Sequence, residues 1–418
     1  MIATRDYALS DRVPVRIEEP PDAAGVATML ERAAHDGAAV VAFGGATLQS
    51  IGNAPVRYDV ALSVRGLDRV LAYDARDLTI GLEAGATLEN VSRVLAASNQ
   101  FLPFDAPHPK AATAGGTLAA GWVGPRSAAY GRLRDLLIGS TAALADGTLA
   151  TAGGMVVKNV TGYDMSKLYV GSLGTLGVLV RANFKALPRA AARRLAVAPL
   201  PDDVRERAIA AVFALPLEPV AALVTVGFFS ATPRVRDEDA RLAVLFEGSD
   251  AVIERATREL RSALGAAGVA QTVLLDEDPA EAAFQRLIDA YVENVDDRSI
   301  TYRSAGLPSN AWARASAARR IAAACAVACE AIVDLRTGAV VMRMSGRTRE
   351  AIAAALARLD GELRRIVPRV NVLAGDPALR AGVDAWGAPP GTLDVMRDLK
   401  RRFDPAAILA PGRYVGGI

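Results

Sequence analysis

Glycine is concentrated in one part of this chain, between Gly153 and Val180. Residues 153–164 and 171–180 interleave glycines with apolar residues and contain few charged ones. Because glycine has no side chain, such backbone can adopt conformations closed to other residues and can approach another group closely. We therefore expect it to pack against a large, flat ligand that carries its own polar groups, such as a cofactor.

Length and charge limit the classes of protein to which the chain can belong. Its 418 residues exceed what one core usually serves, and 51% of them are apolar, so we expect two domains. The net charge of +2 is not the large excess of positive charge that is typical of nucleic-acid-binding proteins. The sequence has neither an uninterrupted apolar run of about 18 residues, as a membrane span needs, nor the order of a signal peptide in residues 1–16. We expect a cytoplasmic protein, with any membrane association made through partners.

Short apolar runs alternate with glycine turns over residues 1–188, which is typical of an α+β layered domain. A helix is predicted over 22–36, after two prolines and before Gly37, and another over 88–97. Strands are predicted over 38–43, 60–64, 79–83, 136–144 and 176–187.

Glycine thins after residue 188, and a second α+β domain is predicted over 189–391. Its amphipathic helices are predicted over 203–213, 251–266, 279–293, 311–324 and 349–366. Its strands are predicted over 220–229, 241–246, 299–304, 328–335 and 339–344, the last two joined by a hairpin turn. These strands predict an antiparallel sheet. Residues 392–418 are turn-rich and too few to bury a core, so we expect them to dock on the first domain.

The first glycine loop follows the strand predicted over 38–43. Gly44 and Gly45 permit positive φ, so successive N–H groups can turn inward and form a nest for a pyrophosphate, while Thr47 and Ser50 add hydroxyl donors. The loop runs into an Asn-Ala-Pro sequence that does not continue a helix, so it is not the Rossmann fingerprint. The phosphate-loop motif of ATPases is also absent from the sequence. Alone, a Gly-Gly pair marks an ordinary turn as readily as a binding site.

Two further glycine-rich segments lie in the same domain. One is a loop over 107–121, centred on Gly115 and Gly116 with Thr113 and Thr117 on either side, and the other spans 171–180. Three such segments can surround a long ligand from three sides. Together they favour a bound flavin dinucleotide.

These motifs resemble those of a known family. The Gly44-Gly45 pair, the segments 113–116, 158–164 and 174–177, and the tail with Phe403-Asp404-Pro405 and Pro411-Gly412 are similar to the FAD-binding domain of the vanillyl-alcohol oxidase / p-cresol methylhydroxylase (PCMH-type) flavoproteins. Among these, the pattern is similar to the FAD-binding E subunit of bacterial glycolate oxidase. The resemblance implies a PCMH-type domain of two α/β subdomains and an α+β cap with an antiparallel sheet.

The resemblance also implies which residues bind FAD. The residues that would hold the pyrophosphate are Gly44, Gly45, Ala46, Thr47, Leu48, Gln49 and Ser50. Those that would run beside it and the flavin are Pro107, Thr113, Gly115, Gly116, Thr117 and Gly121, and those that would line the rest of the cleft are Gly174, Gly177 and Val178. Lys158 and Tyr163 would lie close by. Lys158 is a candidate cation for the flavin N1/C2=O edge, and a solvated or paired lysine is the alternative. Covalent members often have a histidine where this loop has Ala46, so attachment of FAD through the loop is excluded.

Histidine is scarce, because the chain has only His35 and His108 and none after residue 188. Relatives that oxidise 2-hydroxy acids place histidines in the cap, where imidazole accepts the hydroxyl proton. This cap has none. Arg303 and Arg343 are candidates to bind a substrate carboxylate, and Tyr163 is a further weak catalytic candidate. A structural role is expected for His108, which lies between two prolines.

The two cysteines, Cys325 and Cys329, are expected on one helix and are too few for an iron–sulfur cluster, which needs about four ligands. No metal site is expected. We predict a non-covalent FAD subunit of a glycolate oxidase-like 2-hydroxy-acid dehydrogenase complex, with a catalytic FAD subunit and an iron–sulfur subunit as partners. Two alternatives stay open: a self-sufficient FAD oxidase or dehydrogenase of a hydroxy acid or polyol, and a redox-inactive scaffold.

Overall fold

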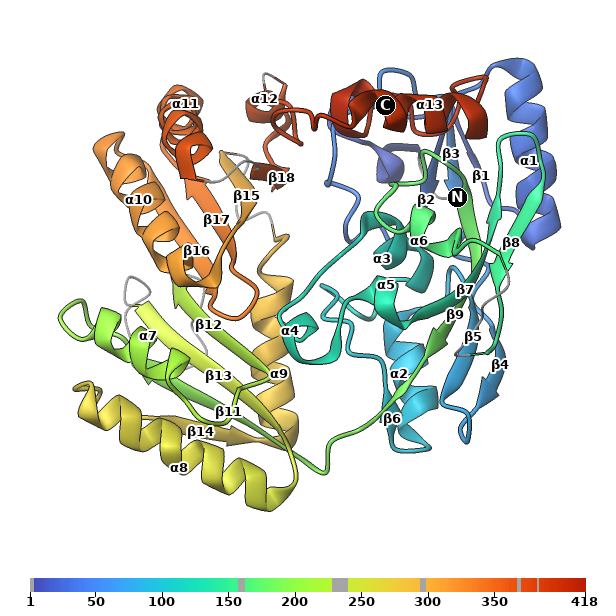
Figure 1. Cartoon of the computed structure of the whole chain (residues 1–418). Helices are drawn as coiled ribbons and strands as arrows, with labels where there is room; N and C mark the ends of the chain where they lie inside the picture. The colour runs from blue at the N-terminus through green and yellow to red at the C-terminus, as the bar shows by residue number, and fades with distance from the viewer. Residues whose placement is uncertain (1–3, 157–161, 228–239, 294–297, 367–369, 382) are drawn as a thin grey trace. The chain divides into compact units, whose positions relative to one another are not determined.

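A computed structural model shows the chain as two compact units, each described here by itself (Figure 1). It describes residues 4–156, 162–227, 240–293, 298–366, 370–381 and 383–418. The first unit comprises Met1–Val123, Arg132–Arg189 and Arg380–Ile418, and the second comprises Gly124–Gly131 and Ala190–Leu379.

In the described residues, the first unit contains three sheets, of three, five and two strands. A parallel sheet has the order β1-β3-β2, formed by β1 (Arg16–Glu18), β3 (Val60–Ser63) and β2 (Val40–Phe43). An antiparallel sheet has the order β4-β5-β9-β7-β8, formed by β4 (Val70–Asp74), β5 (Thr79–Glu83), β9 (Val178–Lys185), β7 (Leu137–Ala143) and β8 (Leu149–Gly153). The remaining strands, β6 (Gln100–Phe101) and β10 (Leu187–Pro188), pair with each other.

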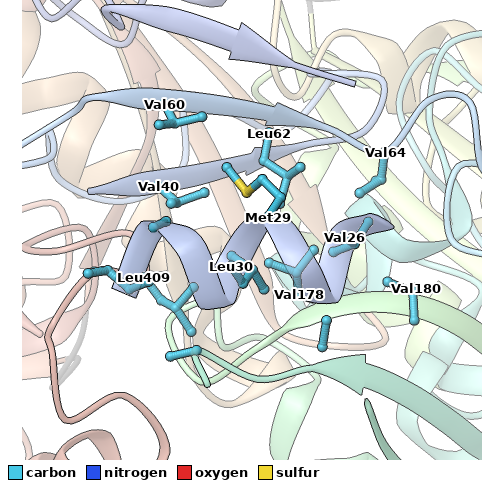
Figure 2. Packing of buried hydrophobic residues seen from close by; sticks show 14 of the residues in the cluster. Val26, Met29, Leu30, Val40, Val60, Leu62, Val64, Val178, Val180 and Leu409 are labelled. Carbon is cyan, nitrogen blue, oxygen red and sulfur yellow. The ribbon is translucent and has the colours of Figure 1, made fainter. Parts of the chain in front are cut away.

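Helix α1 (Ala23–Asp36) has a start and a stop that local chemistry explains. The Asp22 carboxylate accepts a hydrogen bond from the Gly25 amide at 2.8 Å, and Gly37 ends the helix at φ 66°. Its apolar face, with Val26 and Leu30, packs against residues of the three-stranded and five-stranded sheets (Figure 2). The residues from the sheets include Val40, Val60, Leu62, Val178 and Val180. This shared core holds the carboxyl end of β2 in a fixed position.

The second unit is built on one antiparallel sheet of eight strands in the order β14-β11-β13-β12-β16-β17-β15-β18. The strands are β11 (Ala192–Pro199), β12 (Ala221–Val226), β13 (Ala240–Gly248), β14 (Val273–Asp276), β15 (Ser299–Ala305), β16 (Ala328–Asp334), β17 (Ala339–Ser345) and β18 (Val370–Gly375). The main helices are α7 (Arg205–Phe213), α8 (Asp250–Ala266), α9 (Glu277–Asp289), α10 (Ala311–Ala324) and α11 (Arg349–Ile366). The predicted α+β class with an antiparallel sheet is confirmed.

Several details differ from the prediction. The glycine-centred segment predicted as a loop over 107–121 contains a helix, α3 (Ala114–Ala120), and the turn-rich tail contains α13 (Leu393–Phe403). Cys325 follows the end of α10 while Cys329 lies on β16, so the two cysteines do not share a helix. Burial raises the pKa of the Cys329 thiol to about 12, which makes it unreactive. The other helices are α2 (Leu88–Ala96), α4 (Ser127–Tyr130), α5 (Leu133–Leu136), α6 (Ser166–Tyr169) and α12 (Pro377–Arg380).

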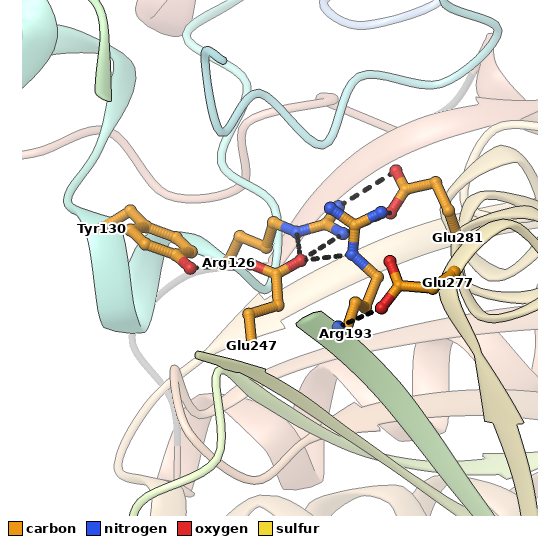
Figure 3. A network of polar contacts seen from close by, with 6 residues as sticks. All are labelled: Arg126, Tyr130, Arg193, Glu247, Glu277 and Glu281. Atoms are coloured by element: carbon orange, nitrogen blue, oxygen red, sulfur yellow. Dashed lines mark hydrogen bonds and ion pairs between the residues drawn. The ribbon is translucent and has the colours of Figure 1, made fainter. Parts of the chain in front are cut away.

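The unit boundaries also differ from those predicted. The chain returns to the first unit at Arg380, earlier than residue 392, and the short segment Gly124–Gly131 belongs to the second unit. Buried ion pairs explain the second difference (Figure 3). The Glu247 side chain, 1% exposed, accepts hydrogen bonds from Arg126 Nη2 at 2.9 Å, Arg193 Nε at 2.7 Å and the Tyr130 hydroxyl at 2.7 Å. We call Glu247, Arg126, Arg193, Tyr130 and Glu281 the Glu247 cluster; Glu281 accepts from Arg126 Nη2 at 2.5 Å.

Candidate cofactor site

A pocket in the first unit lies where the three glycine-rich segments meet. The turn after β2 supplies one wall, α3 a second, and the segment that leads into β9 a third. The predicted residues that line the pocket are Gly44, Gly45, Ala46, Thr47, Leu48, Gln49, Thr113, Gly115, Gly116, Gly174 and Val178. The further lining residues are Ala42, Phe43, Val64, Ala119, Ala120, Leu173, Leu179 and Arg413.

Close packing explains the glycine pair at the end of β2. A Cβ atom on Gly45 would lie 1.6 Å from the Ala111 carbonyl oxygen, and one on Gly44 would lie 2.1 Å from Thr113 Oγ1. The positive φ expected for these glycines occurs instead at Ala46, with φ 61°. The pair is therefore required because the first turn runs directly against residues 111–113.

The first turn presents donors to the pocket. In the residues that the structure describes, the backbone N–H groups of residues 44–48 have no hydrogen-bond acceptor, although Leu48 is buried. Gly44, Gly45 and Thr47 are half-buried and Ala46 is exposed, so their amides are open to the acceptor atoms of a ligand. A concave row of amides is well suited to an anion such as a diphosphate.

Helix α3 forms the second wall and begins with a hydroxyl cap. Thr113 Oγ1 accepts a hydrogen bond from the Gly116 amide at 3.2 Å. Gly115 lies so close to β5 that an added Cβ would be 2.6 Å from Ala84 Cβ. The cap and this packing keep the segment helical despite Gly115 and Gly116, whose low helix propensity is the reason the sequence predicts a loop here.

We expect Thr113→Ala to weaken the site moderately. Loss of the cap should destabilise the first unit by about 1 kcal/mol and weaken FAD binding about fivefold, because α3 would begin less rigidly. Calorimetry and quenching of FAD fluorescence measure the two effects. Thr87→Ala is the matched control, since Thr87 caps α2 in the same way, accepting from the Asn90 amide at 3.3 Å, outside the pocket. It should cost similar stability and leave FAD affinity unchanged; equal affinity losses in both variants would contradict the expectation.

Other predicted residues lie elsewhere. Ser50, Pro107, Thr117, Gly121 and Gly177 do not line the pocket. Thr117 and Gly121 serve α3 instead, because Thr117 Oγ1 donates to the Thr113 carbonyl oxygen at 2.8 Å and Gly121 ends the helix at φ 61°.

The weaker candidates are divided between the two units. Tyr163 is 92% exposed, and Lys158 lies outside the described residues. Arg343, in the second unit, is buried and donates through Nη2 to the carbonyl oxygens of Ala290 at 2.7 Å and Glu293 at 2.6 Å, contacts that hold the end of α9. Arg303 lies on β15 of the same unit, and His108 is half-buried with φ 54°. Their proposed roles remain predictions.

The tail carries a lining residue that sequence reasoning missed. Val40 of β2 donates to Ile408 and accepts from the Ala410 amide, both at 2.8 Å, so the tail continues the parallel sheet. Lys400 Nζ, which is buried, donates to the carbonyl oxygens of Thr175 at 2.9 Å and Leu409 at 2.7 Å. These contacts bring Arg413 to the pocket. The position of Arg413 directly after the Pro411-Gly412 motif is the sequence feature that could have identified it as a lining residue.

Family models of two domains match the chain at these same places. The FAD binding domain matches residues 14–153, and the C-terminal domain of FAD linked oxidases matches residues 386–414. Residues 14–153 and 386–414 therefore match two domains of FAD-linked oxidases. FAD is therefore the cofactor of this flavoprotein, as the sequence predicted, and the unpaired amides of the first turn fit its diphosphate.

Named relatives of the flavoprotein are FAD-dependent oxidoreductases. It is 40% identical over 129 residues to glycolate oxidase subunit GlcE of Escherichia coli (31% of this chain, 37% of that protein). It is 32% identical over 275 residues to D-lactate dehydrogenase of Archaeoglobus fulgidus (63% of this chain, 60% of that protein). The chain thus spans between about a third and three fifths of these relatives. Its fold is similar to that of 4-ethylphenol oxidase from Gulosibacter chungangensis, with a TM-score of 0.68, 14% identity and coverage of 95% of this chain and 88% of that one.

Two kinds of feature are absent from the described residues. No helix there combines the length and hydropathy needed to cross a bilayer. Likewise, the described residues contain no group of three or more histidine, cysteine, aspartate or glutamate side chains that could hold a metal ion.

Proposed function

We propose that this flavoprotein is the non-covalent FAD subunit of a cytoplasmic, glycolate oxidase-like complex that oxidises a 2-hydroxy acid. Bound FAD would supply the chemistry of hydride and electron acceptance. The observation that carries the proposal is the 40% identity over 129 residues with glycolate oxidase subunit GlcE.

The residues of this chain support a carrier role better than an independent catalytic one. Oxidation of a hydroxy acid needs a base for the hydroxyl proton and a cation for the carboxylate. Both histidines of the chain, His35 and His108, belong to the first unit. In the second unit, Arg343 already donates to carbonyl oxygens at the end of α9. We therefore propose that a catalytic FAD subunit delivers electrons to this chain and that an iron–sulfur subunit receives them.

A self-sufficient dehydrogenase is the second candidate. The match to D-lactate dehydrogenase extends over 63% of this chain, against 31% for glycolate oxidase subunit GlcE, and favours this alternative.

One experiment separates the candidates. The purified chain, loaded with FAD, is mixed under anaerobic conditions with glycolate or D-lactate while the flavin absorbance is followed. A carrier subunit should keep its flavin oxidised with either acid alone and become reduced only when the catalytic subunit is added. Direct bleaching by an acid alone would establish the self-sufficient dehydrogenase instead. Flavin that neither the acids nor the partner subunits reduce would overturn both candidates and favour the scaffold.

A further inference from the structure

Arg413 is a buried cation at the edge of the FAD pocket. Its side chain lines the pocket beside the first turn, and the residue is 3% exposed. Its Nη2 atom donates to the carbonyl oxygens of Gln49 at 2.9 Å and Ile51 at 2.7 Å. Among the described residues, Nε and Nη1 have no acceptor. The N–H donors of Nε and Nη1 thus remain available to a ligand.

A second arginine reaches the same turn. Arg380 Nη2 donates to the Gly52 carbonyl oxygen at 2.5 Å, so two cations lie behind residues 49–52. Neither arginine pairs with a carboxylate in the part of the chain that the structure describes. Burial lowers the pKa of Arg413 to about 10, and the nearby charge of Arg380 acts in the same direction. Leaving a buried charge without a counter-ion is costly in free energy, so this arrangement favours an anion.

We propose that Arg413 binds the diphosphate of FAD, so that the C-terminal segment supplies the positive charge of the cofactor site while the first turn supplies its amides. Arg413 and residues 44–48 line one pocket. A guanidinium group donates charge-assisted hydrogen bonds to phosphate oxygens, here from Nε or Nη1 because Nη2 already donates to Gln49 and Ile51, and a neutral turn provides no such charge. By holding Gln49 and Ile51, the same side chain also keeps the turn in the shape that presents its amides.

The test compares ligands that differ in their phosphates. The dissociation constants of FAD and riboflavin for the apoprotein are measured by fluorescence quenching, and the melting temperature is recorded with and without inorganic pyrophosphate. We expect Arg413→Gln to weaken FAD binding by about 10–100-fold, the loss typical of a hydrogen-bonded charged group, while leaving riboflavin binding unchanged. Pyrophosphate should raise the melting temperature of the wild-type apoprotein and not that of the variant.

The control is Arg57→Gln. Arg57 is an exposed arginine that also holds the tail, donating to the carbonyl oxygens of Gly37 at 2.9 Å and Ala407 at 3.0 Å. Its loss should leave FAD affinity and the pyrophosphate effect unchanged. Equal weakening of FAD and riboflavin by Arg413→Gln, with pyrophosphate stabilising both proteins alike, would overturn the proposal and leave Arg413 a purely structural role.

If Arg413→Gln does not fold, two other measurements still test the proposal that Arg413 binds the diphosphate. Arg413→Lys keeps the charge but not the fork, and it should retain the pyrophosphate effect with weaker FAD binding. In the wild-type protein, FAD affinity should fall with added salt while riboflavin affinity stays constant. A salt-independent FAD affinity would contradict the proposal.

Discussion

Gly45→Ala is expected to yield protein that purifies without flavin. The new Cβ atom would lie 1.6 Å from the Ala111 carbonyl oxygen and 2.5 Å from its carbonyl carbon, both of which are backbone atoms. To relieve this overlap, the first turn must move away from residues 111–113. The first turn is one wall of the pocket, and residues 111–113 lead into α3, which is the second wall. Overpacking costs about 1–3 kcal/mol or more, so we expect FAD affinity to fall about 100-fold, as measured by equilibrium dialysis.

The matched control for this variant is Gly66→Ala. Gly66 is exposed, and an added Cβ there would have no atom within 4 Å. This variant should bind FAD as the wild-type protein does. Full flavin occupancy in Gly45→Ala would show that the two walls are not in the contact that the structure describes.

Glu247→Ala is expected to destabilise the second unit by about 3–5 kcal/mol. It removes the carboxylate that pairs with Arg126 and Arg193, whose side chains are 7% and 11% exposed, and a buried charge without its partner is strongly unfavourable. Glu281 continues to pair with both arginines, so we expect the lower end of this range. Hydrogen exchange of amides in β11 and β13 measures the opening free energy of this unit separately.

Glu254→Ala is the control for the Glu247 variant. Glu254 pairs with Arg194 at 2.9 Å but its side chain is 63% exposed, so the loss should stay below about 1 kcal/mol. Similar losses in the two variants would mean that burial does not govern the Glu247 cluster.

The Glu247 cluster also predicts the effect of acid. Burial alone would raise the pKa of the Glu247 carboxyl group, but Arg126 and Arg193 outweigh burial and hold that pKa below its ordinary value. A carboxylate with a depressed pKa in the folded state stabilises the protein above its unfolded pKa of about 4.3, and this stabilisation is lost as pH falls through the folded pKa. Wild-type stability should therefore fall more steeply below about pH 4 than that of Glu247→Gln; parallel acid profiles would contradict this.

Some elements followed from local sequence alone. Helix α1 is bounded by Asp22 and Gly37, residues whose capping chemistry acts within one turn of helix. Strand β2 is a continuous apolar run that ends at the Gly44-Gly45 pair. Strand β11 was missed because Arg193 and Arg194 give it a polar start, and only their ion pairs with Glu247 and Asp276 make those charges compatible with the sheet.

The sequence by itself determined that three glycine-rich segments serve one cofactor, since the density and spacing of glycines reflect backbone that must pack closely. Only the tertiary structure decided that Gly45 packs against Ala111, that α3 is a helix and that Arg413 joins the pocket. Helix caps and the periodic spacing of apolar residues depend on residues that are close together in the chain. The unpaired amides of the first turn and the unpaired charge of Arg413 come together only through contacts between distant segments. Those contacts depend on how the sheets and the tail pack, so no short stretch of the sequence predicts them.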